Sequence, residues 1–203
     1  APQSALASAA ASAAEPAAAA PVDAALTSGW TQAGTCEWMI DAAGKLTVRP
    51  LGNGTSGNLG VNPAGGDQSA PWCDQGKTIT SVVIEPGVST TWARYMFYYC
   101  TNLVTADLSG LDTSSVTSFH SMFDGCKKLE TVDLSGLQTS KATSMSCMFK
   151  HCWKLQELNV SSFDTSNVTS MFEMFFACET IKSFDLTSFD TKKVENMRSL
   201  FRG

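Results

Sequence analysis

"MFDGCKKLETVDLSGLQTSKATSMSC" (residues 122–147) and "MFKHCWKLQELNVSSFDTSNVTSMFE" (residues 148–173) align without a gap, and this repeat decides the fold. Related copies occupy residues 96–121 and 174–199, so one pattern recurs every 26 residues. The ladder phenylalanines are Phe97, Phe123, Phe149, Phe175 and Phe201, and the ladder cysteines are Cys100, Cys126, Cys152 and Cys178. A fixed period of roughly 20 to 30 residues with leucines at constant offsets is typical of leucine-rich repeats. The sequence therefore predicts a solenoid of stacked coils.

Each repeat contains the pattern of a short strand followed by a turn and a short helix. In residues 148–173, Leu158 and Val160 alternate with polar residues, as in a strand with one buried face. The polar segment "FDTSN" (163–167) predicts the turn. The segment "VTSMFEMFFAC" (168–178) has apolar residues at helical spacing, which predicts a helix packed on the sheet. We expect an α/β leucine-rich-repeat solenoid with one strand and one helix per coil.

The region before the repeats divides into two parts. Residues 1–28 are rich in Ala, Ser and Pro and predict a disordered tether, with a short alanine helix as the alternative. Residues 29–78 predict an N-terminal β-rich cap, because "GTCEWMIDAAGKLTVRP" (34–50) has the alternation and turn of a β-hairpin. Residues 79–203 predict the repeat solenoid, with a shortened entry coil at 79–88 and a truncated last repeat.

Composition argues against several functions. The net charge is −5 and no basic stripe is present, so we expect no nucleic-acid partner. No apolar run approaches about 18 residues, so we expect no membrane span in this segment. The nucleophile-elbow, zinc-protease and phosphate-loop motifs are missing, and we expect neither a cofactor nor enzyme activity.

The seven cysteines suggest thiols that pack as small hydrophobes. The ladder cysteines lie in a line along the coils, whereas zinc requires a tetrahedron, so we expect no metal site. Disulfides between neighbouring coils are the alternative for the ladder. Cys36 and Cys73 lie in the cap, where export would favour a disulfide between them, and Cys147 is then the surplus thiol.

A row of polar residues should project outward from consecutive strands. The candidate ligand-binding residues of this sheet face are Thr105, Asp107, Thr131, Asp133, Glu157, Asn159, Ser183 and Asp185. Stacked carboxylates repel unless they are hydrogen-bonded or neutralised. A calcium site is one interpretation of the row, and Asp residues accepting bonds from Ser and Thr of the neighbouring coil are the favoured one. His120 and His151 do not share a repeat position, so they predict surface imidazoles.

The motifs "SSFDTSNVTSM" and "GTCEWMIDAAGKLTVRP" and the pattern MFxxCxxLxxLDLSxF resemble those of BspA-type leucine-rich-repeat surface proteins. The resemblance covers residues 79–203 and the hairpin segment before them. It implies an extracellular bacterial protein, secreted or held at the cell surface, that functions in adhesion. The implied partners are host extracellular or plasma proteins, other cell-surface proteins, or glycans. A structural spacer that displays another domain is the alternative function, and a soluble effector is a weaker third.

Overall fold

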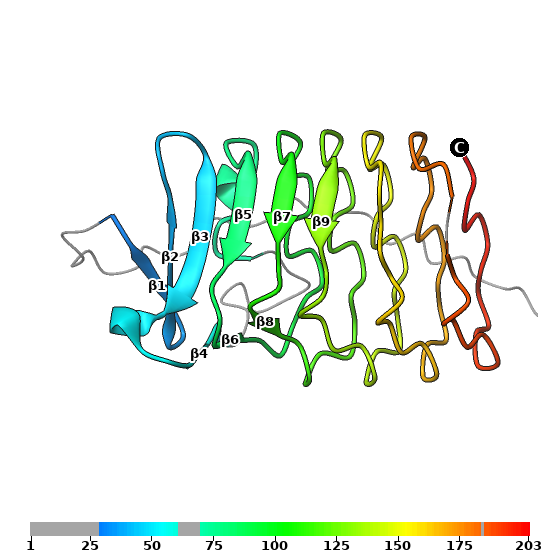
Figure 1. The fold of residues 1–203 in the computed structure, drawn as a ribbon, viewed down its shortest axis with the longest axis horizontal. Helices are drawn as coiled ribbons and strands as arrows, with labels where there is room; N and C mark the ends of the chain where they lie inside the picture. Colours follow the sequence, from blue (N-terminus) through cyan, green and yellow to red (C-terminus); the bar gives the residue numbers. More distant parts are fainter. Residues whose placement is uncertain (1–28, 61–69, 184) are drawn as a thin grey trace, which may run out of the picture.

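The computed structural model describes residues 29–60, 70–183 and 185–203. In this part of the chain, successive coils stack side by side from the N-terminal strands to the C-terminus (Figure 1). The tether predicted for residues 1–28 lies outside the described residues, as do residues 61–69 of the glycine-rich loop. The candidate surfaces below all belong to the described ranges.

A six-stranded sheet forms one side of the stack, in the order β1-β2-β3-β5-β7-β9. Its strands are β1 (Thr31–Ala33), β2 (Cys36–Ile40), β3 (Lys45–Pro50), β5 (Ser81–Ile84), β7 (Thr105–Asp107) and β9 (Thr131–Asp133). Strands β2 and β3 pair antiparallel, which confirms the predicted hairpin. From β3 onward the pairing is parallel, and Thr105 aligns with Thr131 one repeat later. The hairpin thus covers the edge of the first coil.

A second, smaller sheet is formed by strands that come shortly after β3, β5 and β7 in the chain. It contains β4 (Gly57–Asn58), β6 (Val88–Ser89) and β8 (Leu111–Asp112), all parallel. Two single-turn 3-10 helices, Leu51–Asn53 and Cys73–Gln75, lie in the connections. The predicted strand around Leu158 is not formed, although Gln156 N–H still donates to the Glu130 carbonyl at 3.2 Å and keeps the coils aligned.

The helix predicted for each coil is wrong. The turn layer, defined as residues 93–100, 119–126, 145–152 and 171–178, consists of successive tight turns. In its second coil, Met122 and Cys126 N–H groups bond the carbonyl three residues earlier, whereas Ser121 and Phe123 N–H groups bond the next coil. Ser121 has φ 52°, a left-handed conformation that an α-helix cannot contain. Alternate amides therefore point across to the neighbouring coil.

Aromatic rings stack along the core beneath this turn layer. Phe97 and Phe123 have ring centroids 5.2 Å apart, and Phe123 and Phe149 are 5.6 Å apart with nearly parallel planes. Phe149–Phe175 and Phe175–Phe201 continue the stack at 6.0 and 5.6 Å. At the N-terminal end Trp72 stacks on Phe97, so the cap extends the same column. Burial of these rings contributes to the apolar core inside the turn layer.

Buried threonine hydroxyls also link neighbouring coils, in addition to the strands and the turn layer. Thr113, Thr139 and Thr165 are at most 2% exposed. Thr139 Oγ1 donates to the Asp164 carbonyl at 3.1 Å and accepts from the Asp164 N–H at 2.8 Å. Thr113 makes the same two bonds with Gln138, and Thr165 donates to the Asp190 carbonyl at 3.1 Å, so these hydroxyls satisfy backbone groups of the following coil, as a buried backbone requires.

Candidate functional site

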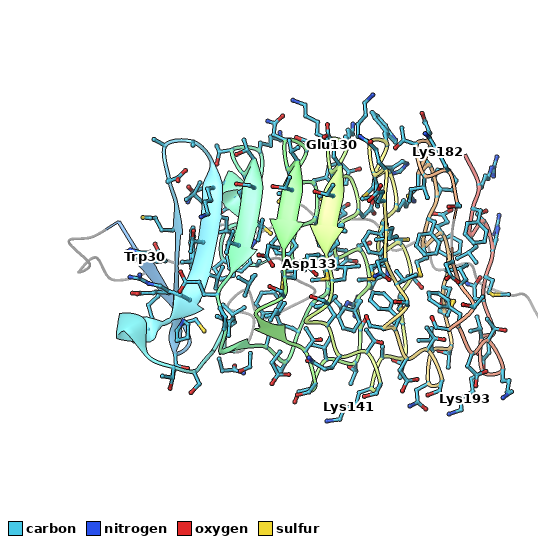
Figure 2. All side chains as sticks on the ribbon, in the orientation of Figure 1. Trp30, Glu130, Asp133, Lys141, Lys182 and Lys193 are labelled. Carbon is cyan, nitrogen blue, oxygen red and sulfur yellow. The ribbon has the colours of Figure 1, made fainter. Side chains whose placement is uncertain are left out.

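The outer face of the parallel sheet carries four of the polar residues that the sequence predicted, Thr105, Asp107, Thr131 and Asp133. On β7 and β9, Ala106 and Val132 face the core side, and Thr105, Thr131 and Asp133 are exposed. Parallel register places Thr105 beside Thr131 and Asp107 beside Asp133. Figure 2 shows Asp133 on this face, between Glu130 at one edge of the stack and Lys141 at the other. The period-2 alternation was thus sufficient to predict which side chains point outward.

A shallow, open groove runs across β5, β7 and β9. Its lining residues are Ser81, Val82, Val83, Thr105, Ala106, Asp107, Thr131, Val132 and Asp133. Four of the predicted residues line it, and β5 contributes Ser81 and Val83, which the prediction missed. Alignment of "ITSVVIEPGV" with the later repeats places Ser81 opposite Thr105, and this signal could have identified it.

The other predicted residues lie on the same exposed side but do not line the groove. Glu157, Asn159, Ser183 and Asp185 are all exposed. They belong to the later coils, beyond the last strand of the sheet, β9. The structure therefore divides the predicted row into a part over the strands and a part over the irregular coils.

The aspartates and the asparagine of the row are each held by their own coil. Asp107 Oδ1 accepts the Ser109 N–H at 3.0 Å and the Ser109 hydroxyl at 2.7 Å. Asn159 and Asp185 accept the same pair of bonds from the residue two positions later. The expected donors on the neighbouring coil are therefore wrong: the bonds are local Asx turns, because the chain bends immediately after the strand. These turns orient the carboxylates identically in successive coils.

Hydrogen bonding favours the ionised forms of Asp133 and Asp185. The Ser135 N–H lies 2.9 Å from Asp133 Oδ1 and, with the Ser135 side chain, lowers the pKa of Asp133. The Thr187 hydroxyl and N–H lower the pKa of Asp185 in the same way. A bond to the charged form stabilises that form, so the pKa falls. Within the described ranges, the structure holds no group of three or more His, Cys, Asp or Glu residues that could bind a metal.

The described cysteines form no disulfide with one another in the structure. The predicted disulfide between Cys36 and Cys73 is not formed, and the Cys73 Sγ atom lies 3.9 Å from the Tyr95 carbonyl. Three ladder thiols donate to a carbonyl of the preceding coil, and Cys126 Sγ lies 3.1 Å from Phe97 O. Burial raises the pKa of Cys126 well above that of an exposed thiol. The ladder cysteines therefore act as buried donors between coils.

One acidic residue that the prediction missed lies in the turn layer. Asp124 is 8% exposed, and desolvation raises its pKa although Ser121 and His151 contact it. His151 Nδ1 lies 3.4 Å from Asp124 Oδ1, so this imidazole is half-buried rather than a plain surface group. Asp124 occupies a position that is Tyr, Lys or Phe in the other coils, a difference visible in the aligned repeats.

The sequence matches the family described as "Mycoplasma protein of unknown function, DUF285" over residues 89–159 and 152–203. These matches cover more than half of the chain, and the chain belongs to this family. No curated protein matches it. Among solved structures it is similar to a leucine rich cell surface protein from Faecalibacterium prausnitzii A2-165, with a TM-score of 0.37 and 18% identity. That similarity covers 78% of this chain and 42% of the other, so this chain spans less than half of that protein.

In the described part of the chain, no helix has the length and apolarity to cross a bilayer.

Proposed function

We propose that this chain is a leucine-rich-repeat binding module of an exported bacterial surface protein, and that its sheet face contacts a partner in adhesion. The observation that supports it is the groove over β5, β7 and β9, whose polar lining repeats in register from coil to coil. The description of the family names no activity, so the proposal rests on this surface.

The charge of the groove indicates the chemistry of its partner. Asp107 and Asp133 lie on adjacent strands, and the pKa of Asp133 is lowered, so that carboxylate is ionised at neutral pH. A partner that supplies Lys or Arg side chains gains an electrostatic attraction there. We therefore favour a host extracellular or plasma protein, or another cell-surface protein, over a glycan at this face.

The residues that line the groove predict weak contacts, so binding would depend on the repetition of these contacts over many coils. Its lining contains no aromatic residue, and aromatic and arginine side chains supply most of the energy of tight interfaces. A weak contact that recurs over many coils gains avidity instead. A partner with a matching row of basic groups would bind clustered copies far better than single ones.

The experiment measures binding of the full chain, free and clustered on beads, to immobilised matrix and plasma proteins. Asp107→Asn and Asp133→Asn together remove two charges but keep the Asx turns, because Asn159 makes the same bonds natively in the next coil. Asp164→Asn is the matched control, since Asp164 accepts the Ser166 N–H in the same way but lies outside the groove.

We expect the double variant to lose saturable binding and the Asp164→Asn control to keep it. If both variants bound equally well, the sheet face would not be the binding surface. If the folded, clustered chain binds none of the proteins, the structural spacer becomes the better function, because nearly identical coils with small polar side chains suit a passive stalk.

A further inference from the structure

The outer side of the turn layer is one of the places where the coils differ from one another. The Phe and Cys ladder positions and the buried threonines Thr113, Thr139 and Thr165 stay constant. Two positions between each ladder Phe and Cys carry unrelated side chains. The first is Tyr98, Asp124, Lys150 or Phe176, and the second is Tyr99, Gly125, His151 or Ala177. The repeat fold does not require these residues, so they are free to serve another purpose.

A tyrosine cluster occupies the first coil of this surface. Tyr98 and Tyr99 have ring centroids 4.5 Å apart, and Tyr95 lies 5.2 Å from Tyr98 and 5.2 Å from His120. Tyr98 and Tyr99 are nevertheless 38% and 45% exposed. Large aromatic surface left in water is a mark of a binding site rather than of packing.

Glycine in the next coil fixes the orientation of Tyr99. A Cβ atom at Gly125 would lie 2.9 Å from a carbon of the Tyr99 ring, so the ring rests directly against this backbone. Gly125 also has φ 78°, a conformation that glycine adopts without strain. The ring is therefore supported from one side by the second coil and keeps an accessible surface without having to reorganise.

A second aromatic group continues the surface onto the third coil. The His151 ring lies 6.5 Å from Trp153 and 5.5 Å from Phe176, edge-on in both cases. Trp153 is 38% exposed. The Asp124–His151 contact at 3.4 Å joins the second coil, beside the tyrosines, to the third coil, which carries Trp153. We define the aromatic face as Tyr98, Tyr99, Asp124, His151 and Trp153.

The charged groups around the aromatic face already have partners. Lys150 Nζ contacts Glu173 Oε2 at 2.6 Å, and Lys127 Nζ lies 4.6 Å from the centre of the Trp153 ring. Asp124 contacts His151 and the Ser121 hydroxyl. A charged ligand would have to compete with these pairs, whereas a neutral ligand with many hydroxyls would not.

From this geometry we infer that the aromatic face binds a neutral carbohydrate. The face of an aromatic ring carries partial negative charge, and the C–H groups of a sugar ring carry partial positive charge, so the two stack favourably. Tyr98, Tyr99 and Trp153 supply the stacking surface. The phenol groups of Tyr98 and Tyr99 and the half-buried His151 imidazole, which Asp124 holds in place, supply hydrogen bonds for sugar hydroxyls. This inference concerns a different surface from the sheet face and does not depend on it.

The experiment measures affinity of the full chain for a panel of neutral oligosaccharides by calorimetry. The panel contains glucans of β-1,3, β-1,4 and α-1,4 linkage, a mannan and a chitin oligomer, with a sulfated dextran as the anionic arm. Two variants borrow the residue that another coil has at the same position. Tyr99→Ala places the residue of Ala177, which also has a left-handed φ of 57°, and Trp153→Lys places the residue of Lys127. Asp133→Asn on the sheet face is the control.

We expect at least one neutral oligosaccharide to bind, and each aromatic variant to weaken that binding by about tenfold or more. The Asp133→Asn control should bind like the unaltered chain, and all proteins should unfold at similar temperatures. The inference is overturned if no neutral oligosaccharide binds, if only the sulfated dextran binds, or if neither aromatic variant changes the affinity. A protein partner lost with Tyr99→Ala, without any sugar binding, would also overturn it and assign the surface to protein recognition.

Discussion

The sheet layer, which contains β5, β7 and β9, and the turn layer both bond their backbone groups to neighbouring coils, but they do so with different backbone conformations. In the sheet layer, strands β5, β7 and β9 bond their neighbours as an ordinary parallel ladder. In the turn layer, every second amide bonds the neighbouring coil and the others close tight turns, as in residues 119–126. Both layers thus satisfy their backbone between coils. The comparison teaches that apolar spacing alone did not determine the backbone, because the same side-chain spacing fits a helix and a ladder of turns.

The two layers also differ in the kinds of residue that occupy their outer positions. The outer sheet positions stay polar from coil to coil, as in Thr105, Thr131, Glu157 and Ser183. The outer turn positions change from Tyr99 to Gly125 to His151. The inner side of the turn layer, in contrast, repeats the aromatic column without exception. Four predictions follow this contrast from the largest effect to the smallest.

The largest expected effect is the loss of a ring from the aromatic column. Phe123 is fully buried and stacks on both Phe97 and Phe149. Phe123→Ala should lower the free energy of unfolding by about 3–5 kcal/mol, because it leaves a cavity that the rigid coils cannot fill. Val132→Ala, in half-buried β9, should cost no more than about 1.5 kcal/mol. Urea unfolding followed by circular dichroism measures both, and equal losses would show that the turn layer does not dominate the core.

The next effect concerns the threonine hydroxyls between coils. Thr139→Val keeps the shape of the side chain but leaves the N–H and the carbonyl of Asp164 without this partner. We expect a loss of about 1–3 kcal/mol in the free energy of unfolding. Thr131→Val, on the exposed face of β9, should change it by less than about 0.5 kcal/mol. A negligible cost at Thr139 would mean that water replaces the hydroxyl and that the bond between coils contributes little.

A smaller change in the free energy of unfolding has a sign that distinguishes tight turns from a helix in the turn layer. Ala177 has φ 57°, so Ala177→Gly should raise the free energy of unfolding by about 0.5–1 kcal/mol by removing left-handed strain. If the segment were helical, the same change would instead cost about 1 kcal/mol. Ala142→Gly is the control, because Ala142 is buried and does not have a positive φ, and it should be destabilising. Thermal and urea unfolding of the pair distinguish the two backbones directly.

The smallest effect is a difference in pH dependence between the two layers. Burial raises the pKa of Asp124, so the folded state holds this proton more tightly, and the stability due to it is lost as pH rises through and above the unfolded value of about 3.9. The pKa of Asp133 is lowered by Ser135, so its contribution is present above about 3.9 and is lost as pH falls.

The measurement compares unfolding free energies of the unaltered chain, Asp124→Asn and Asp133→Asn between about pH 3 and pH 7. Relative to the unaltered chain, Asp124→Asn should gain stability as pH rises, and Asp133→Asn should lose it. Slopes of the same sign would contradict the opposite environments of the two carboxylates.

The site residues were predictable where one local rule sufficed. Alternation along the strand predicted that Asp107 and Asp133 face outward, and the repeat period placed them in register. Asp124 and the tyrosines were not predictable as a surface, because their contacts join residues from three different coils. The donors to the aspartates were assigned to the wrong coil for a related reason: spacing does not say whether the chain turns back at once or continues.

The sequence by itself determined the repeat period, the hairpin before the repeats and the row of phenylalanines, of which Phe97, Phe123, Phe149 and Phe175 are buried, since each depends on side-chain spacing alone. The tertiary structure decided the backbone of the turn layer. A helix satisfies its own amides, but an amide beside an aligned coil can bond that coil instead, and left-handed residues such as Ser121 and Tyr99 direct it there. Which bond forms depends on the neighbour one repeat away, and the spacing within one repeat carries no information about that neighbour.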